Sequence, residues 1–395
     1  MRLLCVITVA FILAFPARAQ EWRGQLSAEY RSFSHAGLDP DQHRGTASLA
    51  AQPEFRTQWQ DGRQLLTFTG FYRWDQHDRQ RTHGDVRELL WLYAGRGFEL
   101  RAGVGKIFWG VAETQNLVDV VNQVDLVEDP DRDEKLGQPM LGATLLTQSG
   151  NWEFYLLPYF RERTLPGEEG RLRTFPRVDT GQDALYESPR GERHVDAAAR
   201  WTRTLGAWDL GLSYFRGTNR EPRLVPGVDA SGQGVLLPYY GRLRQVGLET
   251  QATLQRWLLK LEAVHRSERD ATSRGVTAGF EYTVPGIFGG SSDLGLLAEV
   301  LYDSRGNAAF IPYQDDVMLG VRWSANDAQG TQLLATVVLD RRSSERIYKL
   351  EASRRLTGYL IASLEARAFH GSAPGEPLFS LRRDDYAQLK LTYYF

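Results

Sequence analysis

The stretch YAQLKLTYYF, residues 386–395, alternates between two kinds of side chain. Ala387, Leu389, Leu391, Tyr393 and Phe395 fall on one face of an extended chain, and Tyr386, Gln388, Lys390, Thr392 and Tyr394 fall on the other. This period of two indicates a β-strand with one apolar face, because successive side chains of a strand point to opposite sides. Ten residues are also enough for a tilted strand to cross a bilayer.

The same alternation recurs along the chain in segments of about ten residues. We predict 18 such strands, roughly at 22–33, 45–58, 63–75, 86–95, 98–107, 140–148, 151–162, 193–204, 207–217, 242–254, 257–267, 273–284, 293–303, 316–324, 331–341, 345–355, 358–370 and 385–395. Segment 86–95 is apolar on both parities, so its facing is not assigned.

The connections between these strands alternate in length. Those after even-numbered segments are mostly short, such as Gly95-Arg96-Gly97, whereas those after odd-numbered segments are generally longer and polar, notably 108–139, 163–192, 218–241 and 371–384. An even strand count with tight periplasmic turns and long external loops is typical of bacterial outer-membrane barrels. A soluble barrel or sandwich also alternates, but its apolar face points inward. The predicted fold class is therefore all-β, a transmembrane antiparallel β-barrel of about 18 strands forming one domain at 20–395.

The N-terminus predicts a secreted protein. Arg2 precedes an apolar run at 3–15, and Ala17-Arg18-Ala19 has the A-x-A pattern of a cleavage site, so we predict a signal peptide over 1–19. Cys5, the single cysteine, falls inside it, and the mature chain is expected to have no thiol chemistry. No later segment approaches the roughly 18 apolar residues of a membrane helix. The formal net charge of −2 argues against a nucleic-acid partner.

The predicted signal peptide, the alternating last strand and the terminal Tyr393-Tyr394-Phe395 together resemble the Gram-negative outer-membrane porins. The resemblance implies a location in the cell outer membrane, with lipids and lipopolysaccharide as surroundings. It also implies that Tyr393 and Phe395 belong to an assembly signal that the barrel assembly machinery recognises.

The third long connection, 108–139, is the candidate constriction loop. Its net charge is −6, and Leu117, Val120, Val121, Val124 and Val127 have the spacing of a short amphipathic helix. In general porins the third external loop folds into the barrel and narrows it. We therefore predict an inward, cation-selective constriction; the alternative is a solvated acidic loop over the rim. The predicted selectivity residues are Glu113, Asp119, Asp125, Glu128, Asp129 and Asp131.

The run Asp129-Pro130-Asp131-Arg132-Asp133 begins like a calcium loop, but Glu134 replaces the required glycine and Met140 replaces the final glutamate. An EF-hand is excluded, and a loose external site for a divalent ion stays open. No other metal site and no cofactor are predicted.

The inferred inner face carries both signs of charge, which implies a hydrated interior, wall-bracing ion pairs, or both. The residues predicted to face the lumen include Arg73, Arg101, Arg161, Arg200, Lys260, Arg322, Glu99 and Glu249. The seven histidines are scattered without a linear catalytic or metal-binding motif, so no enzyme is predicted.

These observations predict a porin, a passive diffusion channel for small hydrophilic solutes or ions. The alternative is a non-conducting outer-membrane barrel that binds a ligand or a secretion or assembly partner through its external loops. The pattern selects no particular solute, and a monomer and a homo-oligomer both fit it.

Overall fold

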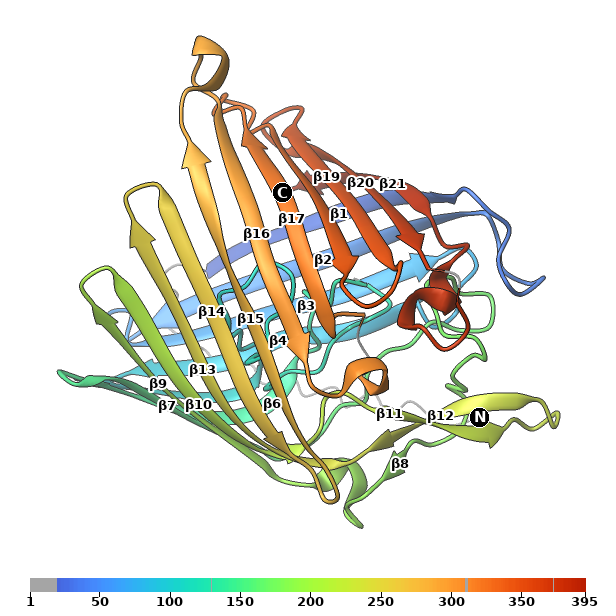
Figure 1. Cartoon of the computed structure of the whole chain (residues 1–395). Coiled ribbons are helices and arrows are strands. Elements are labelled where there is room, and N and C mark those ends of the chain that lie inside the picture. Colours follow the sequence, from blue (N-terminus) through green and yellow to red (C-terminus); the bar gives the residue numbers. More distant parts are fainter. Residues whose placement is uncertain (1–19, 129, 310–311, 372) are drawn as a thin grey trace.

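The computed structural model describes residues 20–395 apart from 129, 310–311 and 372, so the predicted signal peptide lies outside the described residues. Eighteen antiparallel strands form one sheet that closes on itself (Figure 1). They are β1 (Gln20–Phe33), β2 (Gly45–Trp59), β3 (Gln64–Asp75), β4 (His83–Ala94), β5 (Phe98–Gly105), β6 (Gln138–Thr147), β7 (Gly150–Leu157), β9 (Asp196–Leu205), β10 (Trp208–Thr218), β13 (Arg242–Leu254), β14 (Trp257–Ser267), β15 (Thr272–Val284), β16 (Asp293–Asp303), β17 (Asp315–Ser324), β18 (Gln332–Asp340), β19 (Arg346–Arg355), β20 (Leu360–His370) and β21 (Tyr386–Tyr394).

The barrel closes where its first and last strands meet. β1 pairs with β2 on one side and with β21 on the other, and Gly24 N donates to Phe395 O at 3.0 Å while Phe395 N donates to Gly24 O at 3.1 Å. Closure gives every strand two neighbours, which removes the exposed edges that a spanning sheet cannot tolerate. The predicted strand number and fold class are confirmed.

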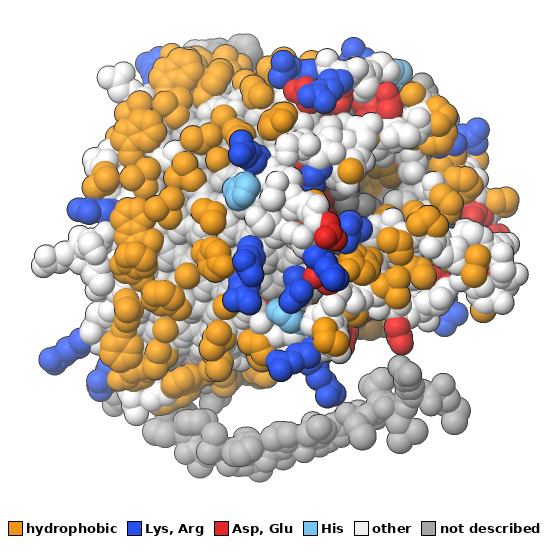
Figure 2. Space-filling view, turned by 60° about the horizontal axis from the view of Figure 1, so that its bottom comes forward, with side chains coloured by type: hydrophobic (Ala, Val, Ile, Leu, Met, Phe, Trp, Pro, Cys, Tyr) orange, Lys and Arg blue, Asp and Glu red, His pale blue; other side chains and the backbone are white. Residues whose placement is uncertain are grey.

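The apolar face of the strands points outward. On β21, Leu389 and Leu391 are exposed, whereas Gln388 and Thr392 are buried. In Figure 2, hydrophobic side chains cover much of one side of the molecule. A soluble barrel has the opposite arrangement, so the outer surface is the kind that faces lipid. Among the described residues, no helix is both long and apolar enough to cross a membrane.

A β-bulge interrupts the alternation of segment 86–95 ahead of its apolar residues. The register against β3 shifts between residues 69 and 70, so that an extra residue is accommodated in β4. Val86 and Leu89 are exposed, while Arg87 is buried and Glu88 is partly buried between them. The inward face therefore changes parity within the strand.

The long connections also carry structure that the alternation did not predict. Three short strands form a separate sheet, namely β8 (Leu185–Tyr186), β11 (Arg223–Val228) and β12 (Gly234–Tyr240). Short 3₁₀ turns lie at Gly191–Arg193, Gly306–Ala308 and Pro377–Leu381 in these connections, and at Ile287–Gly289 between β15 and β16 at the other end of the barrel. The predicted strand 151–162 is shorter than expected: β7 ends at Leu157, because Pro158 has no N–H to continue the ladder.

Candidate pore constriction

The connection between β5 and β6, residues 106–137, runs through the interior of the barrel (Figure 1). We call it the inward segment. It contacts opposite sides of the inner wall: Glu128 Oε1 lies 2.7 Å from Arg73 Nε on β3, and Val118 N donates to Glu262 on β14 at 3.2 Å. These contacts place the segment inside the barrel and not over its rim.

The apolar residues of the inward segment are buried, but they do not form a helix. They pack with Trp109 against inner-wall residues such as Leu157, Phe215 and Val264. The backbone instead forms turns and an isolated bridge between Val124 and Lys135. The helix predicted from Leu117, Val120, Val121, Val124 and Val127 was therefore wrong. These five side chains are buried, but their spacing does not reflect a helix.

Two wall carboxylates take the place of helical carbonyls as hydrogen-bond acceptors for the segment. Glu262 on β14 accepts from Val111 N (2.7 Å), Ala112 N (3.0 Å) and Val118 N (3.2 Å), and Glu299 on β16 accepts from Glu113 N (2.7 Å) and Thr114 N (2.9 Å). The sequence analysis did not identify this role of the two acids. The available signal was Glu262 itself, which faces Glu249 directly across the β13–β14 pair without a basic partner there.

The predicted selectivity residues lie against cations. The ion pairs are Glu113 with Arg322 (2.8 Å) and Lys260 (3.6 Å), Asp119 with Lys135 (3.1 Å), Asp125 with Arg87 (2.6 Å), Glu128 with Arg73 (2.7 Å), and Asp131 with Lys349 (2.5 Å) and Arg367. Asp129 lies outside the described residues. Strands far away in the sequence supply most of these counter-charges, so the charge of −6 counted within 108–139 is not left without cationic partners.

The surroundings of these acids set their ionisation. Burial alone would raise the pKa of Asp131, but Arg367 and Lys349 lower it to about 2. Burial and the neighbouring Asp131 carboxylate instead raise the pKa of Asp133 to about 6. Asp131 therefore stays charged at neutral pH, whereas Asp133 titrates in the range just below it.

The predicted lumen-facing residues form pairs that brace the inner wall. Arg73 pairs with Glu29 and Glu128, Arg101 with Glu99 (3.3 Å), Arg200 with Glu249 and Glu153, and Lys260 and Arg322 both with Glu113. Arg161 differs, because it follows the end of β7 and pairs with Asp85 at 2.6 Å.

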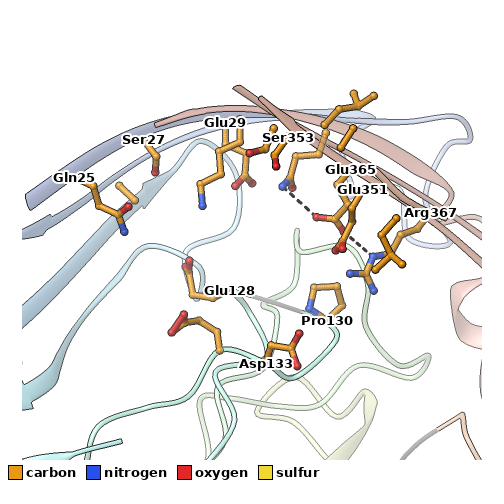
Figure 3. Close-up of a pocket in the computed structure, with 18 of the residues that line it drawn as sticks. Gln25, Ser27, Glu29, Glu128, Pro130, Asp133, Glu351, Ser353, Glu365 and Arg367 are labelled. Carbon is orange, nitrogen blue, oxygen red and sulfur yellow. Dashed lines mark hydrogen bonds and ion pairs between the residues drawn. The ribbon is translucent and has the colours of Figure 1, made fainter. Parts of the chain in front are cut away.

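A polar cavity of about 550 Å³ lies between the inward segment and the inner faces of β1–β3 and β17–β21 (Figure 3). Its charged lining consists of Glu29, Glu128, Asp133, Glu134, Glu351, Glu365, Arg73, Arg322, Arg367 and Lys390. Charges are costly to bury without water, so this lining indicates a hydrated space. In Figure 3, Glu128, Pro130 and Asp133 of the inward segment face wall residues of β1, β19 and β20 across it.

A second cavity, of about 290 Å³, lies on the side of the long connections. Leu172, Tyr313 and Leu381 line it, together with Asp131. Both cavities have Pro130 and Arg367 in their linings. The Arg367–Asp131 ion pair therefore stands at the junction between an outer and an inner chamber.

Comparison with known proteins supports the fold. No protein-family model and no curated protein matches the sequence. Three Pseudomonas aeruginosa porins of known structure are similar to 95% of this chain. OccK3 (OpdO) has a TM-score of 0.54 and 11% identity, and 95% of its own chain is covered. OccD3 (OpdP) has a TM-score of 0.53 and 9% identity, and 91% of its chain is covered. OccK2 (OpdF), in complex with glucuronate, has a TM-score of 0.53 and 14% identity, and 96% of its chain is covered. The resemblance drawn from the terminal residues is thus confirmed for the fold: the chain has the barrel architecture of the outer-membrane porins.

Proposed function

We propose that this protein is an outer-membrane channel through which small hydrophilic solutes or ions diffuse passively. The observation that carries the proposal is the cavity of about 550 Å³, lined by charged and polar side chains, inside a barrel with an apolar outer face. The route runs from the outer chamber, past Arg367 and Asp131, into this cavity and towards the short turns. No covalent step is involved. The glucuronate in the OccK2 complex is a small polar molecule of the proposed class.

The outer membrane is the proposed location, with lipids and lipopolysaccharide around the barrel. Tyr393 and Phe395 support this, because both are exposed on the outer face of the last strand near the short-turn end. Aromatic side chains at that level match the girdle of a membrane barrel. We propose that the barrel assembly machinery reads this strand.

Two adjacent residues of β1 provide the test. Ser27 lines the inner cavity, and Ala28 is exposed on the outer face. In planar bilayers, the Ser27→Cys channel should lose current after reaction with a charged methanethiosulfonate, whereas Ala28→Cys should keep its current under the same treatment. The proposal would be contradicted if the parent protein gave no current steps. It would also be contradicted if the reagent reduced the current equally in both variants.

A non-conducting barrel that binds a partner through its loops is the second candidate. The ion pairs of Asp131 with Arg367 and Lys349 favour it, because they lie where the two cavities share Pro130 and Arg367 and narrow that junction. An intact, membrane-inserted protein without current steps would support this candidate over the channel.

A further inference from the structure

Three long connections meet at the outer rim through a cluster of two histidines and one glutamate. His43 lies between β1 and β2, His77 between β3 and β4, and Glu169 between β7 and β8. One potential ligand atom from each lies within 4.8 Å of the others, and His43 Nε2 is 3.5 Å from Glu169 Oε2. The side chains of His43 and Glu169 are about half exposed (48% and 44%), so a dissolved ion can reach them.

The backbone around the cluster is already held in place by bonds that do not use its ligand atoms. Gln42 Nε2 donates to Gly170 O at 2.7 Å, which joins the β1–β2 connection to the β7–β8 connection. Gly167 N donates to Asp78 Oδ1 at 3.1 Å, which joins the β7–β8 connection to the β3–β4 connection. An ion would therefore find the three loops assembled, so binding does not require their ordering.

The cluster offers a defined set of donor atoms. The two imidazole rings stack with centroids 3.6 Å apart, so their ring nitrogens lie close together, and a neutral imidazole offers one nitrogen lone pair to a metal ion. Neither ring nitrogen of His77 forms a hydrogen bond within the described part of the chain. The neighbouring carboxylate of Asp78 is occupied by backbone amides, and that of Asp75 by Arg81 and Thr46.

We propose that His43, His77 and Glu169 bind one divalent transition-metal ion. Two imidazole nitrogens and one carboxylate suit Zn²⁺, Ni²⁺ or Cu²⁺, whereas Ca²⁺ and Mg²⁺ prefer sites made of oxygen alone. The rings turn out of their stack so that one nitrogen of each reaches the ion at about 2.0–2.1 Å, and water completes the coordination. The bound ion links three external connections above the outer chamber.

Zn²⁺ binding to the full-length barrel in detergent, measured by calorimetry in metal-free buffer, tests this site. We expect one equivalent of Zn²⁺ to bind, with affinity at least tenfold lower in His77→Gln and in Glu169→Gln. His35→Gln is the matched control, because His35 is an exposed histidine outside the cluster in the same connection as His43. Its affinity should equal that of the parent, and excess Ca²⁺ should not compete.

A second measurement separates loss of the site from loss of the fold. All variants should show the heat-modifiable gel mobility of a folded barrel, and Zn²⁺ should slow tryptic cleavage of the 34–44 and 76–82 connections at least tenfold in the parent but not in His77→Gln. Absence of saturable Zn²⁺ binding by the folded parent would overturn the proposal. Equal weakening by His35→Gln and His77→Gln would overturn it as well. Neither outcome depends on whether the barrel conducts.

Discussion

Replacing Asp131 with Asn should shift the ion preference of the channel towards anions. The carboxylate of Asp131 lies between Arg367 on β20 and Lys349 on β19 at the junction of the two chambers. Asn keeps the size of the side chain and removes one negative charge. The fold should tolerate this change, because Arg367 keeps Glu365 at 2.6 Å and Lys349 keeps Glu351 at 2.8 Å.

Coulomb's law gives the size of the effect. For an ion passing about 7 Å from the altered charge, one unit of charge changes its energy by roughly 0.6 kcal/mol at the dielectric constant of water and roughly 2.4 kcal/mol at an effective value of about 20. Since about 1.4 kcal/mol corresponds to a factor of ten, the permeability of cations should fall by a factor between about 3 and 50, and that of anions should rise by the same factor. The permeability of cations relative to anions should therefore fall at least about sevenfold.

Reversal potentials across a planar bilayer with a KCl gradient measure this ratio directly. Salt near 0.1 M keeps the screening length at about 10 Å, so the charge still acts across the passage. Asp270→Asn is the matched control, because it makes the same chemical change at an exposed residue of the connection between β14 and β15. An unchanged ratio in a folded, conducting Asp131→Asn channel would mean that ions bypass the junction.

Three further predictions test the barrel and its interior. Leu391→Arg should destabilise membrane insertion by about 2–4 kcal/mol. Ser363 lines the inner cavity, so Ser363→Arg should insert normally and lower the conductance. Equal loss of heat-modifiable barrel in both variants would refute the assigned facing. Deleting Phe395 should leave the protein secreted but reduce the assembled barrel in outer-membrane fractions, and normal amounts there would speak against its role as an assembly signal. Burial and Asp131 raise the pKa of Asp133 to about 6, so this carboxyl is neutral below that pH and charged above it. The preference for cations should therefore rise between pH 5 and 7. If the same rise occurred in Asp133→Asn, the titrating group would be a different one.

The strands were predictable because their signal is local. Side-chain alternation depends only on neighbouring residues, and a lipid-facing surface enforces it along each strand. The facing of 86–95 could not be assigned because both faces of that strand are apolar. Leu89 is exposed on the outer face, whereas Leu90 packs inward against the buried cluster around Trp109. The small sheet of β8, β11 and β12 was missed for another reason. β8 has only two residues, and Pro226, Gly227 and Pro238 interrupt β11 and β12.

The interior was less predictable because its contacts join residues far apart in the chain. Asp131 and Arg367 are separated by 236 residues, so a count of charges within 108–139 could not include the wall cations that balance them. The metal-binding cluster was missed in the same way, because His43, His77 and Glu169 lie in three different connections and no linear motif joins them.

The false helix shows how the inward segment is stabilised. A helix satisfies its own amides, so a segment with helical spacing can enter a barrel without help from the wall. Here the amides of 111–118 reach Glu262 and Glu299 instead, while the apolar side chains pack against the wall on the same side. Charge-assisted bonds of this kind are stronger than bonds between neutral groups. Both the polar and the apolar contacts of the segment therefore depend on the wall, and its position should be fixed only once the barrel has closed.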